Sequence, residues 1–151
     1  MLEYTIAAAT VGPLRAVARC RDAEIELDTD PAGRAEAFNP AELLLTAVAA
    51  CMLKGIERVA PMLRFGWRGA SVRVHGVRQD APPRMIRIEY ELVVDTDERD
   101  ARLELLHRNV RTYGTVSNTI AAAVELTGVV RRATEVPEAA RVSAPAAGRS
   151  A

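Results

Sequence analysis

Residues 38–52 of the chain read Phe-Asn-Pro-Ala-Glu-Leu-Leu-Leu-Thr-Ala-Val-Ala-Ala-Cys-Met. Asn39 belongs to the residue types that cap helix N-termini, and Pro40 suits the first helical position, where a backbone N–H would have no partner. Glu42 falls in the first turn, where the helix dipole stabilises a carboxylate. From Leu43 to Leu53 the helix is apolar all round, which predicts that it is buried in the protein.

A second informative stretch, residues 113–120, reads Tyr-Gly-Thr-Val-Ser-Asn-Thr-Ile. The residues before it, 98–112, have the apolar spacing of a helix, and Gly114 suits the position just past a helix C-terminus. We expect a further helix after the glycine, through Leu126, and a short last strand at 129–130. These two stretches give the chain its most recognisable local structure.

The remaining segments predict strands. Residues 3–10 are rich in alanine and ambiguous, whereas residues 15–21 and 24–28 alternate and predict a small antiparallel meander. Two longer strands are expected at 71–77 and 86–94, the second with one apolar face. Strands cluster before and between the helices instead of alternating strictly with them, so the fold class is α+β.

The composition limits the possible partners. The chain has 151 residues, about one domain's worth, with 20 basic and 20 acidic side chains and a formal net charge of zero. This balance gives no electrostatic reason to expect a nucleic acid or a membrane surface as partner. We expect one domain over 1–134 and a disordered tail over 135–151, which is rich in Ala, Pro, Gly and Ser.

Export and cofactor signals are not found. The N-terminus lacks a basic segment followed by a long apolar run, and the run from Leu43 to Leu53 is too short to cross a membrane. We therefore expect a cytoplasmic protein, whose thiols stay reduced. Neither cysteine, Cys20 or Cys51, belongs to a CxxC pair, and His75 and His107 are scattered. No metal site and no cofactor are predicted.

Cys51 is the leading candidate for chemistry, but the residue type alone allows two interpretations. Free cysteine is among the most buried residue types, so the simpler interpretation is a small hydrophobe in a core helix. A thiol in apolar surroundings is inert unless a cation or a hydrogen-bond donor stabilises its thiolate. A catalytic Cys51 therefore requires an activating group nearby.

The motif Asn39-Pro40-x-Glu42-Leu43-(x)7-Cys51, followed by Val116-Ser117-Asn118-Thr119-Ile120, resembles the paired signatures of the OsmC/Ohr family. The resemblance covers roughly residues 2–130. It implies an intertwined homodimer of two α+β subunits, with antiparallel sheets around buried central helices and sites at the subunit interface. It also implies the reduction of organic hydroperoxides by a pair of cysteines.

In peroxidatic members of this family, the thiolate at the position of Cys51 becomes a sulfenic acid, and a second cysteine then closes a disulfide. An arginine from the N-terminal strands and a glutamate just after the Asn-Pro stabilise the thiolate and orient the peroxide. On this resemblance we expect Cys51, Glu42 and Arg15 to be the catalytic residues. Arg19 is a further substitute for the arginine.

The chain departs from the family pattern at three places. The second cysteine is replaced by Gly114, and the glutamate position is occupied by Ala41, with Glu42 one place further on. That shift rotates a helical side chain by about 100°. The family arginine aligns near Gly12-Pro13, so Arg15 is only the nearest substitute. Glu42 has an alternative role, as a carboxylate that stabilises the helix N-terminus.

Two functions remain open on these observations. The first is a thiol peroxidase that uses Cys51 alone, with an external thiol reductant, on bulky alkyl or lipid hydroperoxides. The second is a non-enzymatic homodimer that binds an apolar ligand or a partner in the degenerate site. Cys20 replaces the missing cysteine only if its strand passes near Cys51, and packing is the simpler interpretation of Cys20. We expect His75 to face solvent on its strand, and His107 to lie beside Leu103 and Leu106 at the border of the interface. Tyr113 is a possible pocket residue.

Overall fold

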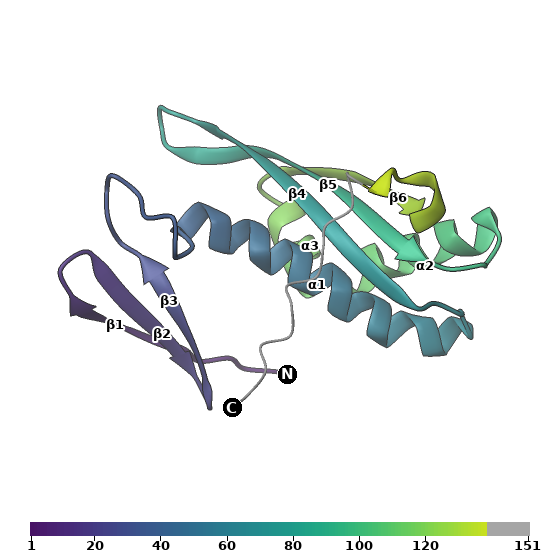
Figure 1. The fold of residues 1–151 in the computed structure, drawn as a ribbon, viewed down its shortest axis with the longest axis horizontal. Coiled ribbons are helices and arrows are strands. Elements are labelled where there is room, and N and C mark those ends of the chain that lie inside the picture. Colours follow the sequence, from purple (N-terminus) through teal and green to yellow (C-terminus); the bar gives the residue numbers. More distant parts are fainter. Residues whose placement is uncertain (139–151) are drawn as a thin grey trace. The chain divides into compact units, whose positions relative to one another are not determined.

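The computed structural model describes residues 1–138, and Figure 1 shows their strands and helices. The chain divides into two compact units, the first over Met1–Thr46 and the second from Ala47 onward. Helices and two separate three-stranded sheets confirm the α+β class. None of the helices described is long and apolar enough to cross a membrane.

The N-terminal unit contains an antiparallel meander of β1 (Ala7–Gly12), β2 (Arg15–Cys20) and β3 (Ala23–Asp28). Leu14 and Arg21, in the two tight turns, have φ angles of 59° and 55°. The predicted meander is confirmed, and the ambiguous segment at 3–10 contributes its first strand.

The loop from β3 to the first helix is closed by a buried carboxylate. Asp28 accepts backbone N–H bonds from Asp30 (2.8 Å) and Arg34 (2.9 Å) on its two oxygens, and its own N–H donates to the carbonyl of Phe38 (3.0 Å). Gly33 has a φ of 84°, which a glycine adopts without strain. These bonds order the loop immediately before the Asn-Pro motif.

Helix α1 (Pro40–Leu63) begins at the predicted residue. Its buried side chains lie on one face, at the spacing of a helix against a core: Val48, Met52, Ile56, Val59 and Ala60. Leu44 and Leu53 remain more than a third exposed, so the expectation that the helix is buried on all sides is wrong for a single chain. The core of the single chain covers only one face of the apolar segment from Leu43 to Leu53. Pro61 lies in the last turn, where it does not end the helix at once.

The second unit contains β4 (Gly69–Gln79), β5 (Arg84–Asp95) and β6 (Glu125–Arg132), in that order across the sheet (Figure 1). β4 and β5 are antiparallel, and β6 is parallel to β5. The predicted apolar face of β5 is confirmed, because four of its members are less than a tenth exposed: Ile88, Tyr90, Leu92 and Val94.

A helical crossover, α2 (Asp100–Tyr113) and α3 (Thr115–Ala121), joins β5 to β6. The helix expected to reach Leu126 ends five residues earlier, and the strand expected at 129–130 is eight residues long. Gly114 separates the helices, but its φ of −78° is extended and not left-handed as the C-terminal glycine prediction implied.

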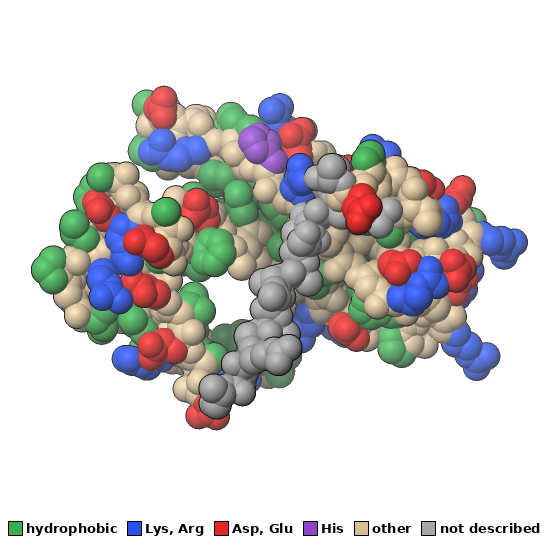
Figure 2. Space-filling view, in the orientation of Figure 1, with side chains coloured by type: hydrophobic (Ala, Val, Ile, Leu, Met, Phe, Trp, Pro, Cys, Tyr) green, Lys and Arg blue, Asp and Glu red, His purple; other side chains and the backbone are tan. Residues whose placement is uncertain are grey.

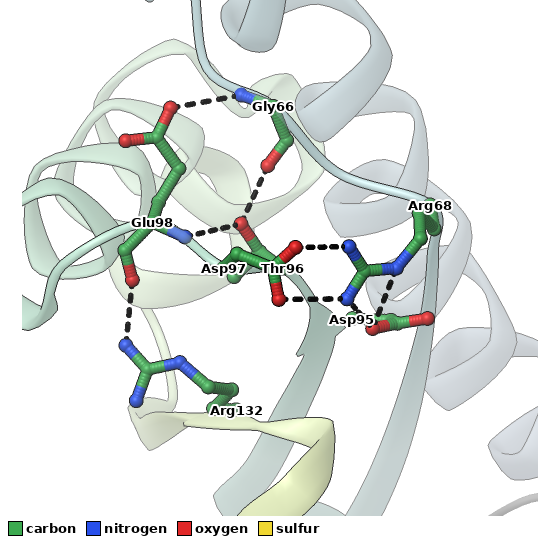
Figure 3. A network of polar contacts seen from close by, with 7 residues as sticks. All are labelled: Gly66, Arg68, Asp95, Thr96, Asp97, Glu98 and Arg132. Carbon is green, nitrogen blue, oxygen red and sulfur yellow. Dashed lines mark hydrogen bonds and ion pairs between the residues drawn. The ribbon is translucent and has the colours of Figure 1, made fainter.

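A polar network ties together the chain segments at the end of β5 (Figure 3). Arg68 donates to Asp95 (2.6 Å) and to Asp97 (2.6 Å), while Glu98 accepts the backbone N–H of Gly66 (3.0 Å). Arg132, at the end of β6, donates to the carbonyl of Glu98 (2.7 Å). These bonds connect the end of α1, the start of β4, the start of α2 and the end of β6.

After β6, a short 3-10 turn (Ala133–Glu135) leads to Val136, which is only 5% exposed. The tail expected from 135 therefore begins with described residues that form a turn and a buried contact. Its remainder, 139–151, lies outside the described residues, and the proposed domain limit at 134 stays a prediction.

Candidate functional site

Cys51 lies in the middle of α1 at the border between its buried and exposed faces. The next residue, Met52, is 1% exposed and Leu53 is 37% exposed, whereas Cys51 itself is partly exposed. The thiol is free, and within residues 1–138 it makes no hydrogen bond that would hold it. Cys51 is therefore not a fully buried core cysteine of the single chain.

Glu42 takes part in a reciprocal cap at the start of α1. Its backbone N–H donates to Oδ1 of Asn39 (2.9 Å), and the backbone N–H of Asn39 donates to Oε2 of Glu42 (2.9 Å). This is a capping box, which satisfies donors that the helix cannot bond internally. The geometry favours the alternative role of Glu42, as a carboxylate that stabilises the helix N-terminus.

Arg15 lies on β2 and is paired across the sheet. Its Nε donates to Oε1 of Glu26 on β3 (2.9 Å), and the side chain is 53% exposed. The hydrogen bond to Glu26 raises the pKa of Arg15 above its usual range. Arg19 is paired in the same way with Glu24 (2.6 Å). Both arginines considered from the sequence therefore have a carboxylate partner on the neighbouring strand.

Arg34 is a more buried arginine of the same unit, and the sequence reasoning missed it. Its Nη2 donates to Oε1 of Glu26 (2.9 Å), its side chain is 20% exposed, and its Nη1 is buried with no hydrogen-bond partner. Together Arg15 and Arg34 hold the pKa of Glu26 below its usual range. The turn residues Asp28 to Gly33 signal an ordered loop, but no local pattern predicts which carboxylate Arg34 meets.

Gly114, where the family resemblance leads us to expect a second cysteine, is tightly surrounded. A Cβ placed on Gly114 would lie 3.0 Å from Oγ of Ser117 and 3.1 Å from the carbonyl oxygen of Val110. Ser117 is 1% exposed, and its hydroxyl is buried without a partner. Position 114 thus has no space for a cysteine side chain unless these neighbours move.

Cys20 lies at the end of β2, partly exposed, with its Sγ 3.6 Å from the carbonyl oxygen of Thr5. It lines a hollow of about 380 Å³ in the N-terminal unit. The other lining side chains are mostly apolar, among them Ile6, Ala8, Ala18, Ile25, Leu27 and Leu43. The hollow has the character of a site for an apolar group.

Three further residues were considered as site residues from the sequence: His75, Tyr113 and His107. His75 is exposed on β4, as predicted. Tyr113 is 43% exposed, and the Arg58 guanidinium carbon lies 5.5 Å from the centre of its ring. His107 is instead bonded to Tyr90, in a cluster with Arg111 that the sequence did not indicate.

Comparisons with known proteins agree with this fold. The family model described as OsmC-like protein matches residues 33–128. No curated protein sequence matches the chain. An OsmC-like protein from Mycoplasma pneumoniae superposes with a TM-score of 0.80 at 20% identity, over 87% of this chain and 97% of the other.

Two other solved structures show the same fold. A putative osmotic stress induced and detoxification response protein from Psychrobacter arcticus 273-4 has a TM-score of 0.74 at 22% identity, with 87% and 98% of the two chains covered. An organic hydroperoxide resistance protein OsmC from Legionella pneumophila has a TM-score of 0.65 at 21% identity, with coverage of 86% and 98%.

An α+β chain with a free thiol in its first helix, matched over most of its length by one family model, is an OsmC-type protein. The chain belongs to the OsmC-like family.

Proposed function

We propose that this protein reduces organic hydroperoxides with Cys51 as its one reacting thiol, and that an external thiol completes the cycle. The observation that carries the proposal is the free, partly exposed Cys51 at the signature position of α1. The crowded Gly114 supports the one-cysteine form, because no second sulfur fits there without rearrangement.

One proposed cycle consumes one hydroperoxide and two external thiols. The Cys51 thiolate attacks the distal peroxide oxygen, the O–O bond breaks, and the alkoxide takes a proton and leaves as an alcohol. The enzyme is left as a sulfenic acid. One external thiol then attacks this sulfur and releases water, which gives a mixed disulfide. A second external thiol displaces Cys51 and leaves as the external disulfide.

The functional unit of this proposal is a homodimer. Leu44 and Leu53 of α1 are 36% and 37% exposed. The N-terminal unit also exposes several large apolar side chains (Figure 2), among them Tyr4, Ile6, Val11, Leu14, Ile25 and Phe38. A second copy would cover such surfaces. Light scattering on a size-exclusion column tests this, and a monomer at micromolar concentration would contradict it.

Intact-mass spectrometry with cumene hydroperoxide tests the chemistry. With dimedone present, we expect one adduct per chain in the wild type and in Cys20→Ser, and none in Cys51→Ser. Cys20→Ser is the matched control, because it removes the other thiol and leaves Cys51. An unmodified Cys51 after prolonged excess peroxide would refute the peroxidase.

One observation favours a second function, the binding of an apolar ligand without turnover. The hollow beside Cys20 is lined mainly by apolar side chains, and the expected activating residues Arg15 and Glu42 are engaged in other bonds. Titration with a fluorescent fatty acid distinguishes the two functions. Binding that the Ile25→Asp variant abolishes, together with an unreactive Cys51, would establish the second.

A further inference from the structure

A cluster of three side chains joins β5 to α2, and the proposed thiol chemistry does not use it. The hydroxyl of Tyr90 lies 2.6 Å from Nε2 of His107, and Nη1 of Arg111 donates to the same hydroxyl at 2.9 Å. The guanidinium of Arg111 also lies over the Tyr90 ring, and the two rings of Tyr90 and His107 meet edge to face. Tyr90 is 4% exposed.

The hydrogen-bond partners favour one arrangement of the protons. A guanidinium only donates, so the Tyr90 oxygen accepts from Arg111. In the arrangement that we assign, the Tyr90 hydroxyl donates to Nε2 of His107, and the neutral imidazole carries its proton on Nδ1. Burial lowers the pKa of His107; the charge of Glu104 opposes this and that of Arg111 adds to it.

His107 is nevertheless within reach of solvent. It lines a hollow of about 270 Å³ between α2 and β6, together with Glu104 and Arg131. Arg131 is paired with Glu91 (3.1 Å), so its charge is largely balanced. The charged and titratable groups around His107 are thus Tyr90 on β5, Glu104 and Arg111 on α2, and Arg131 on β6.

Protonation of His107 weakens this arrangement. Nε2 would become a donor, so the Tyr90 hydroxyl would lose His107 as the acceptor of its proton and would have to accept from both His107 and Arg111. The imidazolium and the guanidinium would also be two cations bonded to one phenol oxygen in a partly buried place. We therefore expect the cluster to form when His107 is neutral and to separate when His107 is charged.

The cluster is coupled to the helix that carries the thiol. Val110 lies between His107 and Arg111 on α2, and it packs on Gly55 of α1. A Cβ on Gly55 would be 2.9 Å from Cγ1 of Val110, so the two helices are in close contact here. Gly55 is one helical turn beyond Cys51.

We propose that His107 is a proton-sensitive positioning residue. Neutral His107 holds α2 on β5 through Tyr90. Protonated His107 releases α2, and this loosens the packing of Val110 on Gly55, one helical turn from Cys51. The consequence for Cys51 rests on the proposed peroxidase function, whereas the release of α2 does not.

Hydrogen exchange of the full-length protein tests the release directly. In the wild type we expect the protection of α2 amides, corrected for intrinsic exchange, to fall by about fivefold or more between pH 7.5 and pH 5.0. His107→Gln should remove this pH-dependent loss. His75→Gln is the matched control, because it changes the only other histidine, which is exposed on β4. It should behave as the wild type.

Tyr90→Phe is a second variant, in case His107→Gln does not fold. It keeps the ring and removes the hydroxyl, so α2 should be weakly protected at both pH values. Unchanged protection of wild-type α2, or a pH-dependent loss that persists in His107→Gln, would overturn the proposal. Peroxide oxidation of Cys51 is followed in the same samples. An unreactive wild-type Cys51 would refute the peroxidase and leave the exchange result valid.

Discussion

At the scale of single residues, Gly114 stands where the family resemblance leads us to expect a second cysteine. Its missing side chain leaves Ser117 and Val110 close to the backbone, and an added Cβ would lie 3.0 Å from the Ser117 hydroxyl. We predict that Gly114→Ala lowers the free energy of unfolding by about 1–3 kcal/mol, the usual range for an overpacked site. Urea unfolding, followed by circular dichroism, measures this change.

The control for this prediction is Gly69→Ala. A Cβ on Gly69 would have no heavy atom within 4 Å, so this change should stay within about 0.5 kcal/mol of the wild type. Equal effects of the two substitutions would show that the crowding at 114 relaxes easily. The one-cysteine form would then lose its steric support.

The residue scale is also where prediction from sequence was weakest. Local rules predict Asn39 as the helix cap and Glu42 as a first-turn carboxylate, and the structure adds the reciprocal bonds between them. Arg34 and Tyr90 could not be placed in this way. Arg34 meets Glu26 through a loop closed by Asp28, and Tyr90 meets His107 across seventeen residues. Such contacts depend on the tertiary fold, and the local sequence pattern does not predict them.

At the scale of elements, the start of α1 offers a test of what Glu42 does. Asn39→Ala removes the side chain that accepts the Glu42 N–H, and we predict a loss of about 1 kcal/mol in the free energy of unfolding. Glu42→Gln keeps an oxygen that accepts the Asn39 N–H, so stability should change little. Thermal unfolding at fixed protein concentration compares both variants.

The rate of Cys51 oxidation in Glu42→Gln separates the cap from a catalytic role. A carboxylate that serves only the cap leaves the second-order rate with cumene hydroperoxide within about twofold of the wild type. A tenfold loss at unchanged stability would instead support Glu42 as a catalytic residue.

The elements that were predicted well are those with a strong local period. β5 was visible from its alternation, and α1 from its cap and its long apolar run. The local pattern does not predict the full length of β6. Its hydrogen bonds are with β5, which is parallel to it and lies about forty residues earlier in the chain. Gly128 in β6 lies against the Tyr90 ring, with an added Cβ only 2.5 Å from three ring carbons. Glycine has a low strand propensity, but the Tyr90 ring leaves no space for a larger side chain at position 128.

At the scale of the whole molecule, the pKa shifts predict that acid destabilises the protein in two stages. The pKa of His107 is lowered in the folded state, mainly by burial, from an unfolded value near 6.5. The unfolded chain therefore binds this proton first, and stability falls as the pH drops below about 6.5. Three carboxylates have lowered pKa values, so they stabilise the folded state down to a lower pH than His107 does: Glu26, Asp97 and Glu98.

We therefore expect the free energy of unfolding, measured in urea between pH 8 and pH 3, to decline first below about pH 6.5 and again below about pH 4.5. His107→Gln should abolish the first decline and keep the second, because the carboxylates are bonded to Arg15, Arg34, Arg68 and Arg102 and not to the histidine. His75→Gln should keep both. A first decline that persists without His107 would assign it to another group. Its loss would show that one partly buried imidazole sets the pH at which acid begins to destabilise the folded chain.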